Sequence, residues 1–175
     1  MSFHHLAIAT CDLEANHAFY TESMGFTLER TNVAPTDTGG WARHVFYDTG
    51  NGEMIAFWDI HDDPTIGDFE PSISKGLGLP AWTNHIAFDA PSLDDLAAAR
   101  PRWLDHGFYV YEIDHGWCTS IYTTDPNGIM VEFCTTTAVA TDADRALAAS
   151  LLTATKPELE AAPTGTLYSP EGAPV

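Results

Sequence analysis

The chain has 175 residues, of which 45% are hydrophobic and five are tryptophan. This predicts a packed globule, formed as one domain or as two small modules that share a core. The formal net charge is −18, and only seven residues are Lys or Arg. Because phosphate binding needs basic side chains, nucleic acids and anionic membrane surfaces are excluded as expected partners. No apolar run approaches the roughly 18–20 residues that span a bilayer.

The N-terminus and the cysteines indicate the compartment. Residues 1–5, MSFHH, lack the basic region and apolar stretch of a signal peptide. Cys11, Cys118 and Cys134 are odd in number, far apart and without a Cys-x-x-Cys spacing. A disulfide framework is therefore not expected, and the sequence favours a reducing cytoplasm.

The chain contains an internal repeat, which starts at His5 and again at His85. Each copy begins with a short alternating strand, continues with a stretch of helical period and ends in Gly-Phe. Asp12 and Ser92 stand where helix N-caps are expected, and the glycine of each Gly-Phe pair stands where a C′ glycine is expected. Each copy is thus predicted to start with a strand and a helix.

The repeat resumes further along the chain. GNGEMIAF at 50–57 parallels PNGIMVEF at 126–133, and each has Asn-Gly in a turn that leads into a strand. With the strand-like segments before them, each copy reads βαβββ. We therefore expect an α+β fold of two tandem modules whose curved mixed sheets enclose a cavity. The expected divisions are a first module at 1–60, a connecting loop at 61–82, a second module at 83–137, and a C-terminal helix with a loosely held tail at 138–175.

Strand parity predicts which side chains line this cavity. His5 and His85 hold equivalent positions in the two copies, and Glu132 shares a strand face with Met130 and Cys134. A carboxylate that faces the interior must be paired or ligated, because burying it alone is costly, and few basic residues are present. Two histidines and one carboxylate with open coordination positions suit Fe(II) or a related divalent ion. The sequence therefore predicts a metal site made by His5, His85 and Glu132.

Other polar residues have simpler interpretations. His4 is expected to face solvent, on the opposite side of the strand from His5. His44, on a predicted strand beside Phe46, is interpreted as a structural residue rather than a cavity residue. The Asp-Pro-Asn-Gly segment at 125–128 is interpreted as a turn without a chemical role.

The paired βαβββ modules with these three ligands resemble the vicinal oxygen chelate superfamily over residues 3–137. This superfamily includes glyoxalase I, methylmalonyl-CoA epimerase, fosfomycin-resistance transferases, bleomycin-binding proteins and type I extradiol dioxygenases. By this resemblance His5, His85 and Glu132 are the metal ligands. Glyoxalases and epimerases usually place a fourth ligand on the last strand of the first module, where this chain has Ala56. Three ligands favour the dioxygenase or fosfomycin-transferase branches.

The stretch IDHGWCTSIYTTDPNGIMVE at 113–132 resembles the extradiol dioxygenase signature. In this chain the matching positions are Ile113, His115, Ile121-Tyr122, Asp125-Pro126, Gly128 and Glu132. The resemblance implies that His115 contacts the bound diol or oxygen and that Tyr122 hydrogen-bonds the deprotonated substrate oxygen. Extradiol enzymes usually carry a further acid/base histidine upstream of the second ligand, and this chain has none between Asp62 and Asn84.

The resemblance implies an Fe(II)-dependent extradiol dioxygenase that acts on a catechol or another vicinal diol, with O2 as co-substrate. Mn, Zn and Ni are alternative metals. Two other classes stay open: a glyoxalase-like or fosfomycin-transferase-like lyase, isomerase or transferase, and a non-enzymatic protein that binds a small ligand. In each case we expect a small-molecule partner and a cytoplasmic homodimer.

Overall fold

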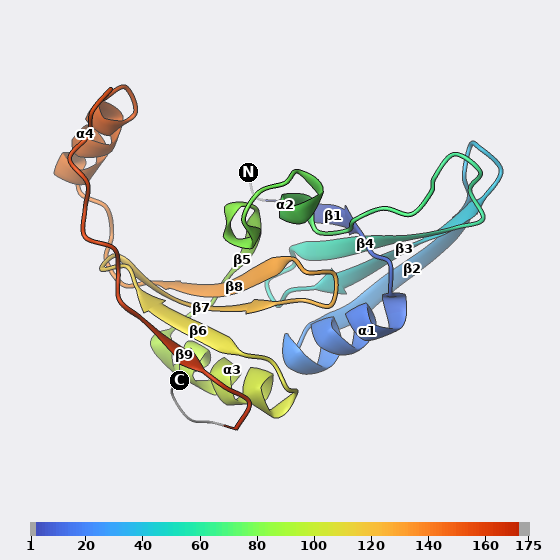
Figure 1. Ribbon diagram of the computed structural model, residues 1–175. Coiled ribbons are helices and arrows are strands. Elements are labelled where there is room, and N and C mark those ends of the chain that lie inside the picture. Colours follow the sequence, from blue (N-terminus) through green and yellow to red (C-terminus); the bar gives the residue numbers. More distant parts are fainter. Residues whose placement is uncertain (1–2, 172–175) are drawn as a thin grey trace.

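The computed structural model describes residues 3–171, which form two β-sheets, each with a helix on one side (Figure 1). Residues 1–2 and 172–175, at the ends of the expected first module and tail, lie outside the described residues. The strand order is β1-β4-β3-β2 in the first sheet and β5-β8-β7-β6-β9 in the second. No helix within the described range has the length and apolar character needed to cross a bilayer.

The first sheet corresponds to the first copy of the repeat. Its strands are β1 (His5–Ala9), β2 (Thr27–Pro35), β3 (Trp41–Asp48) and β4 (Met54–His61). β1 runs parallel to β4, and the chain leaves β1 through α1 (Leu13–Ala18) and the π-helical turn η1 (Phe19–Ser23). The Asp12 carboxylate caps α1 by accepting a hydrogen bond of 3.0 Å from the Ala15 N–H. Gly25 ends this segment with φ at +78°, a conformation that favours glycine.

The second sheet repeats this arrangement. Its strands are β5 (His85–Asp89), β6 (Val110–Asp114), β7 (Cys118–Thr124), β8 (Met130–Thr136) and β9 (Gly165–Tyr168). β5 runs parallel to β8 after the crossover helix α3 (Leu93–Asp105). Ser92 caps α3 by accepting from the Asp95 N–H at 3.2 Å, and Gly107 follows it with φ at +85°. The predicted α+β fold of tandem βαβββ modules is confirmed.

The connecting segment holds two short helices that its aperiodic sequence did not indicate. They are α2 (Ile73–Gly76) and η2 (Ala81–Thr83). The hydroxyl of Ser74, which is buried, accepts a hydrogen bond of 2.9 Å from the Asn84 N–H. A side-chain contact of this kind, rather than a hydrophobic period, holds the two turns together.

The C-terminal segment is not loosely held throughout, in contrast to the prediction. The expected helix is present as α4 (Asp142–Leu151), but β9 then pairs antiparallel with β6. The guanidinium carbon of Arg100 lies 4.7 Å from the centre of the Tyr168 ring. Gly165 lies directly against Tyr111, and a Cβ there would force the end of the Tyr111 ring to move. These contacts join residues far apart in sequence, so composition alone could not predict them.

The hydrophobic core lies between the helices and the helix-facing sides of both sheets. Tyr47 and Phe57 enter it from the first module, and Trp103 and Val131 enter it from the second. The same cluster includes Phe26, whose ring centre is 4.9 Å from that of Phe88 in the other module. The two modules therefore share one core.

The turn at 125–128 joins the modules. Asn127 accepts a hydrogen bond of 2.8 Å from the Thr10 hydroxyl and donates one of 2.7 Å to the side-chain oxygen of Asn16. Asp125 accepts one of 3.1 Å from the Tyr20 hydroxyl. All five side chains are buried. The turn thus has a structural role between the two modules.

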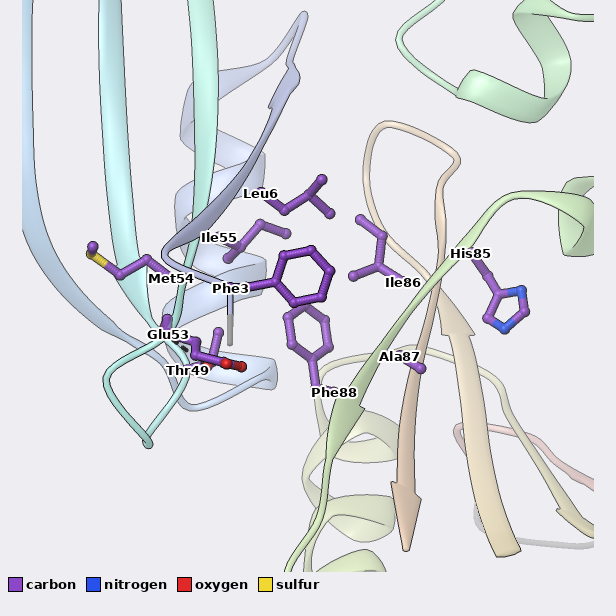
Figure 2. A pocket seen from close by; sticks show the side chains of 10 residues that line it. All are labelled: Phe3, Leu6, Thr49, Glu53, Met54, Ile55, His85, Ile86, Ala87 and Phe88. Atoms are coloured by element: carbon purple, nitrogen blue, oxygen red, sulfur yellow. Dashed lines mark hydrogen bonds between the residues drawn. The ribbon is translucent and has the colours of Figure 1, made fainter. Parts of the chain in front are cut away.

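This packing determines where the other faces of the sheets point. Because the helix-facing sides of the two sheets meet in one core, the opposite face of each sheet is turned outward. We call this outward side, which carries no helix, the open face of the sheet. Figure 2 shows this between β1 and β5, where Leu6 and Ile86 point toward one another while His85 points away from β1. A single chain therefore does not enclose the predicted cavity between its two open faces.

Candidate metal centre

Two of the predicted ligands meet on the open face of the second sheet. His85 is the first residue of β5, and Glu132 lies in the middle of the neighbouring β8, where it pairs with Ala87. The Nε2 atom of His85 is 3.1 Å from Oε2 of Glu132. The His85 side chain is partly exposed, whereas Glu132 is only 5% exposed.

Two contacts orient the ring of His85. Its Nδ1 atom lies 3.0 Å from the carbonyl oxygen of Trp82. A carbonyl oxygen can only accept, so Nδ1 is the donor of this hydrogen bond, and Nε2 is left to face Glu132. A lone pair and a carboxylate at this separation repel each other unless a proton or a metal cation lies between them. A histidine that donates one ring N–H to a carbonyl is also the usual arrangement of a metal ligand.

Glu132 is held from the neighbouring strand. The buried Ser120 hydroxyl donates a hydrogen bond to Oε1 of Glu132, which leaves Oε2 directed at His85. No Lys or Arg within residues 3–171 forms an ion pair with Glu132. The basic group beside Glu132 is the His85 imidazole, so a proton on that ring or a bound cation would balance the buried charge. His85 and Glu132 are therefore suitable ligands for a divalent cation, and they supply two of the three predicted protein ligands.

His115 and Tyr122 lie beside this pair. Tyr122 is directly across from Glu132 on β7, and its hydroxyl is 3.0 Å from Nε2 of His115. Burial, with the nearby Glu132 charge adding to it, raises the pKa of Tyr122 to about 12. The phenol is therefore protonated at neutral pH and can donate a hydrogen bond.

A hollow on this face contains the four residues. Besides His85, His115, Tyr122 and Glu132, its walls are Ala87, Trp117, Cys118 and Cys134. None of these is Lys or Arg. Burial is the main factor that raises the pKa of Cys134 to about 11, so this thiol is not a ready nucleophile. The hollow suits an uncharged ligand with apolar and metal-binding parts.

The third predicted ligand, His5, lies elsewhere. It stands on the open face of the first sheet, with its ring centre 5.3 Å from that of Phe46, and its Nδ1 is 2.8 Å from Nδ1 of His4. In residues 3–171 no group of three His, Cys, Asp or Glu side chains is placed to hold a metal ion. The parity prediction for His5 agrees with the strand pairing, but one chain does not bring His5 to His85 and Glu132.

His44 shares the open face of the first sheet with His5, and the centres of the two rings are 6.0 Å apart. It pairs with Trp58 across β3 and β4, and the two rings stack with centres 3.8 Å apart. Burial, followed by the charge of His5, lowers the pKa of His44. Its even-number spacing from Phe46 was the signal in the sequence. Ser120, which the sequence analysis also missed, shares the face of Tyr122 by the same parity.

Sequence comparison assigns the family. Residues 2–133 match the Glyoxalase/Bleomycin resistance protein/Dioxygenase superfamily. The chain belongs to this superfamily. The resemblance inferred from the repeat is thus confirmed at the superfamily level. The glyoxalase/bleomycin resistance/dioxygenase match does not select the extradiol branch.

Several solved structures share the fold. A glyoxylase/bleomycin resistance protein/dioxygenase domain from Frankia sp. EAN1pec has a TM-score of 0.59 at 18% identity, covering 78% of this chain and 92% of that one. TnmS3, an antibiotic binding protein from Streptomyces sp. CB03234, has 0.54 at 17%, covering 78% and 97%. Lactoylglutathione lyase from Agrobacterium tumefaciens has 0.52 at 20%, covering 77% and 92%. No curated protein sequence matches the chain significantly.

Proposed function

We propose that this protein is a metal-dependent enzyme that acts on a small molecule able to chelate the metal through two oxygens. The observation that carries the proposal is the placement of His85, whose Nε2 atom faces a buried carboxylate 3.1 Å away while its Nδ1 atom lies 3.0 Å from the Trp82 carbonyl oxygen. His85 and Glu132 would hold the ion, with His5 of a second copy as the third ligand. A divalent ion in this site supplies positive charge that lowers the pKa of the bound substrate oxygens.

A homodimer is the arrangement that supports this ligand set. β1 pairs only with β4 and β5 only with β8 within the described residues, so each has a free edge. Free, mostly apolar edge strands are ready to pair with another chain. Pairing β1 of one copy with β5 of the other would bring the open face of the first module toward the open face of the second. His5 and Glu132 would then face the same cavity.

The surrounding side chains act on the substrate. Tyr122, which is protonated at neutral pH, donates a hydrogen bond to a substrate oxygen, and His115 orients the Tyr122 hydroxyl or exchanges a proton with it. Trp117 and the apolar wall exclude water from the reacting atoms. Ala56, buried on the open face of the first module, supplies no fourth ligand.

More specifically, we propose that this metal-dependent enzyme is an Fe(II) extradiol-type dioxygenase that acts on a catechol. Three protein ligands leave positions for two diol oxygens and O2, and the spacing of His115, Tyr122 and Glu132 resembles the extradiol signature. A lyase, isomerase or transferase on the same ligand set would need the substrate but no O2. The free cysteines Cys11, Cys118 and Cys134 favour a reducing cytoplasm.

The second candidate function is metal-free binding of a small ligand. It is favoured by the separation of His5 from His85 and Glu132 within one chain. TnmS3, an antibiotic binding protein, shares the fold. In this case the apolar hollow beside Trp117 would hold the ligand without a metal.

One experiment separates these candidates. The purified protein is loaded anaerobically with Fe(II), Mn(II), Zn(II) or Ni(II), and O2 uptake is followed with a panel of catechols, before and after treatment with a chelator. The proposal predicts stoichiometric metal binding, with O2 uptake in the Fe(II) form that the chelator abolishes. Metal binding without O2 uptake would reject the dioxygenase proposal. Absence of metal binding, together with ligand affinity that survives the chelator, would reject the enzyme.

A further inference from the structure

Helix α4 is unpartnered in the described chain. None of its residues, Asp142–Leu151, is buried. Leu147 and Leu151, spaced four apart on one side, are 55% and 41% exposed. The helix is nevertheless well formed, since Thr141 and Asp144 make a reciprocal capping box. An isolated helix of this length is marginal in water, so its apolar side is expected to pack against something.

The arm that carries α4 is fixed at both ends. The N–H groups of Thr137 and Ala138 donate to the carbonyl oxygen of Trp117, at 2.8 and 3.0 Å. At the far end β9 pairs with β6. Figure 1 shows α4 beyond the end of the second sheet, on the side away from α3. That is the side of the sheet that carries His85 and Glu132.

We infer that α4 is a clasp that packs against the first module of a second copy of this chain. The inference rests on the proposed function, in which the open face of the second sheet receives that module. Since α4 stands beside this face and none of its residues is buried by the rest of residues 3–171, we infer that α4 extends the same interface. Its leucines would cover apolar surface of the second copy next to the metal site.

The receiving face has complementary chemistry. On the open face of the first sheet Trp58 is 39% exposed, and Arg30 pairs with Phe46 at the exposed strand β2. Arg30 forms no ion pair within residues 3–171. The first turn of α4 contributes Asp142, which also pairs with Arg145 of the same helix at 2.9 Å, and Asp144, which accepts from the Thr141 cap. An acidic, leucine-bearing helix therefore fits a face with an exposed tryptophan and an unpaired arginine.

The test compares a double variant, Leu147→Glu/Leu151→Glu, with Ala149→Glu, which adds a charge on the opposite side of α4. Sedimentation equilibrium of the full chain over a concentration series gives the dimer dissociation constant, and circular dichroism checks the fold. Burial of two leucines predicts a dissociation constant raised about 100-fold in the double variant. Ala149→Glu should leave it within about twofold.

The outcomes distinguish this inference from the proposed function. A wild-type dimer that is weakened in the double variant alone supports the clasp. A wild-type dimer with unchanged affinity in the double variant overturns the clasp and leaves the shared metal site standing. A wild-type chain that is monomeric at every concentration overturns both. Hydrogen exchange gives an independent measure, since α4 amides should be protected in the dimer and should exchange freely in the diluted monomer.

Discussion

The Nε2 atom of His85 lies 3.1 Å from Oε2 of Glu132, while Nδ1 of the same ring donates to the Trp82 carbonyl oxygen at 3.0 Å. The Trp82 carbonyl therefore orients the ring, and the Nε2 atom of His85 meets a carboxylate on the neighbouring strand. This relationship is the basis of the metal assignment, and it leads to a direct test.

His85→Ala and Glu132→Gln should each lose most of the bound metal. Each change removes one ligand from a set that has no spare donor. The measurement is elemental analysis after dialysis against a divalent ion. His106→Ala is the control, since His106 is exposed on the second module and away from the open face. Full metal content in both ligand variants would reject the site.

Ser120→Ala should weaken metal affinity without abolishing it. The Ser120 hydroxyl donates to Oε1 of Glu132, so its loss frees the carboxylate to rotate. Partners that orient a ligand typically contribute 10–100-fold in metal affinity. Calorimetric titration with the metal measures the change, and His106→Ala again serves as the control, since His106 is exposed and away from the open face. An unchanged affinity would mean that Glu132 is held by its strand alone.

Tyr122→Phe and His115→Ala should reduce turnover but retain the metal. A group that stabilises charge or transfers a proton contributes about 10²–10⁴-fold in rate. Tyr122→Phe removes only a hydroxyl, so a packing role would leave the rate almost unchanged. Turnover is followed with the catechol that gives the fastest O2 uptake. Near-wild-type rates in both variants would restrict the chemistry of this hairpin to Glu132.

The raised pKa of Tyr122 predicts a pH dependence of stability. The folded phenol keeps its proton up to about pH 12, whereas an unfolded tyrosine releases it near pH 10. Between these values the folded state binds more protons than the unfolded state, so the free energy of unfolding falls as pH rises. Urea titrations at pH 9 and 11 should show a smaller loss in Tyr122→Phe than in the wild type. Equal losses would contradict the assignment.

Asp125→Ala should destabilise the fold by about 2–4 kcal/mol. The Asp125 carboxylate accepts hydrogen bonds from the Tyr20 hydroxyl and from the N–H groups of Asn127 and Ile129. Removing it leaves buried donors without partners across the contact between modules. Urea denaturation measures the change, and the exposed Asp37→Ala should stay within about 0.5 kcal/mol of the wild type.

The sequence contained enough information for the modules but not for their mutual arrangement. Repeated caps at Asp12 and Ser92 and repeated Asn-Gly turns are local signals, and they predicted the βαβββ units. Strand parity predicted that Glu132 shares a strand face with Met130 and Cys134. The relative orientation of the sheets depends on long-range contacts, such as Phe26 with Phe88, and on the hydrogen bonds of Asn127. No local pattern encodes those contacts, so the enclosed cavity was assigned to one chain.

His44 and strand β9 show the same contrast between features that a local pattern predicts and features that depend on long-range contacts. His44 could have been placed on the face of His5 by counting along its strand, because period-two alternation applies there as it does to Glu132. The β9 strand could not have been found in this way. Its pairing depends on Gly165 fitting beside Tyr111 and on Arg100 stacking on Tyr168, and each contact spans more than fifty residues of chain.

The most direct test of a metal site shared by two copies is complementation between His5→Ala and Glu132→Ala chains. Each variant alone should lack bound metal. In a heterodimer isolated through two different affinity tags, one cavity combines the intact His5 of one chain with the intact His85 and Glu132 of the other. The other cavity lacks both. Metal content in the heterodimer should return to about half of the wild-type value. A heterodimer that binds no more metal than either variant alone would rule out a site shared by two copies.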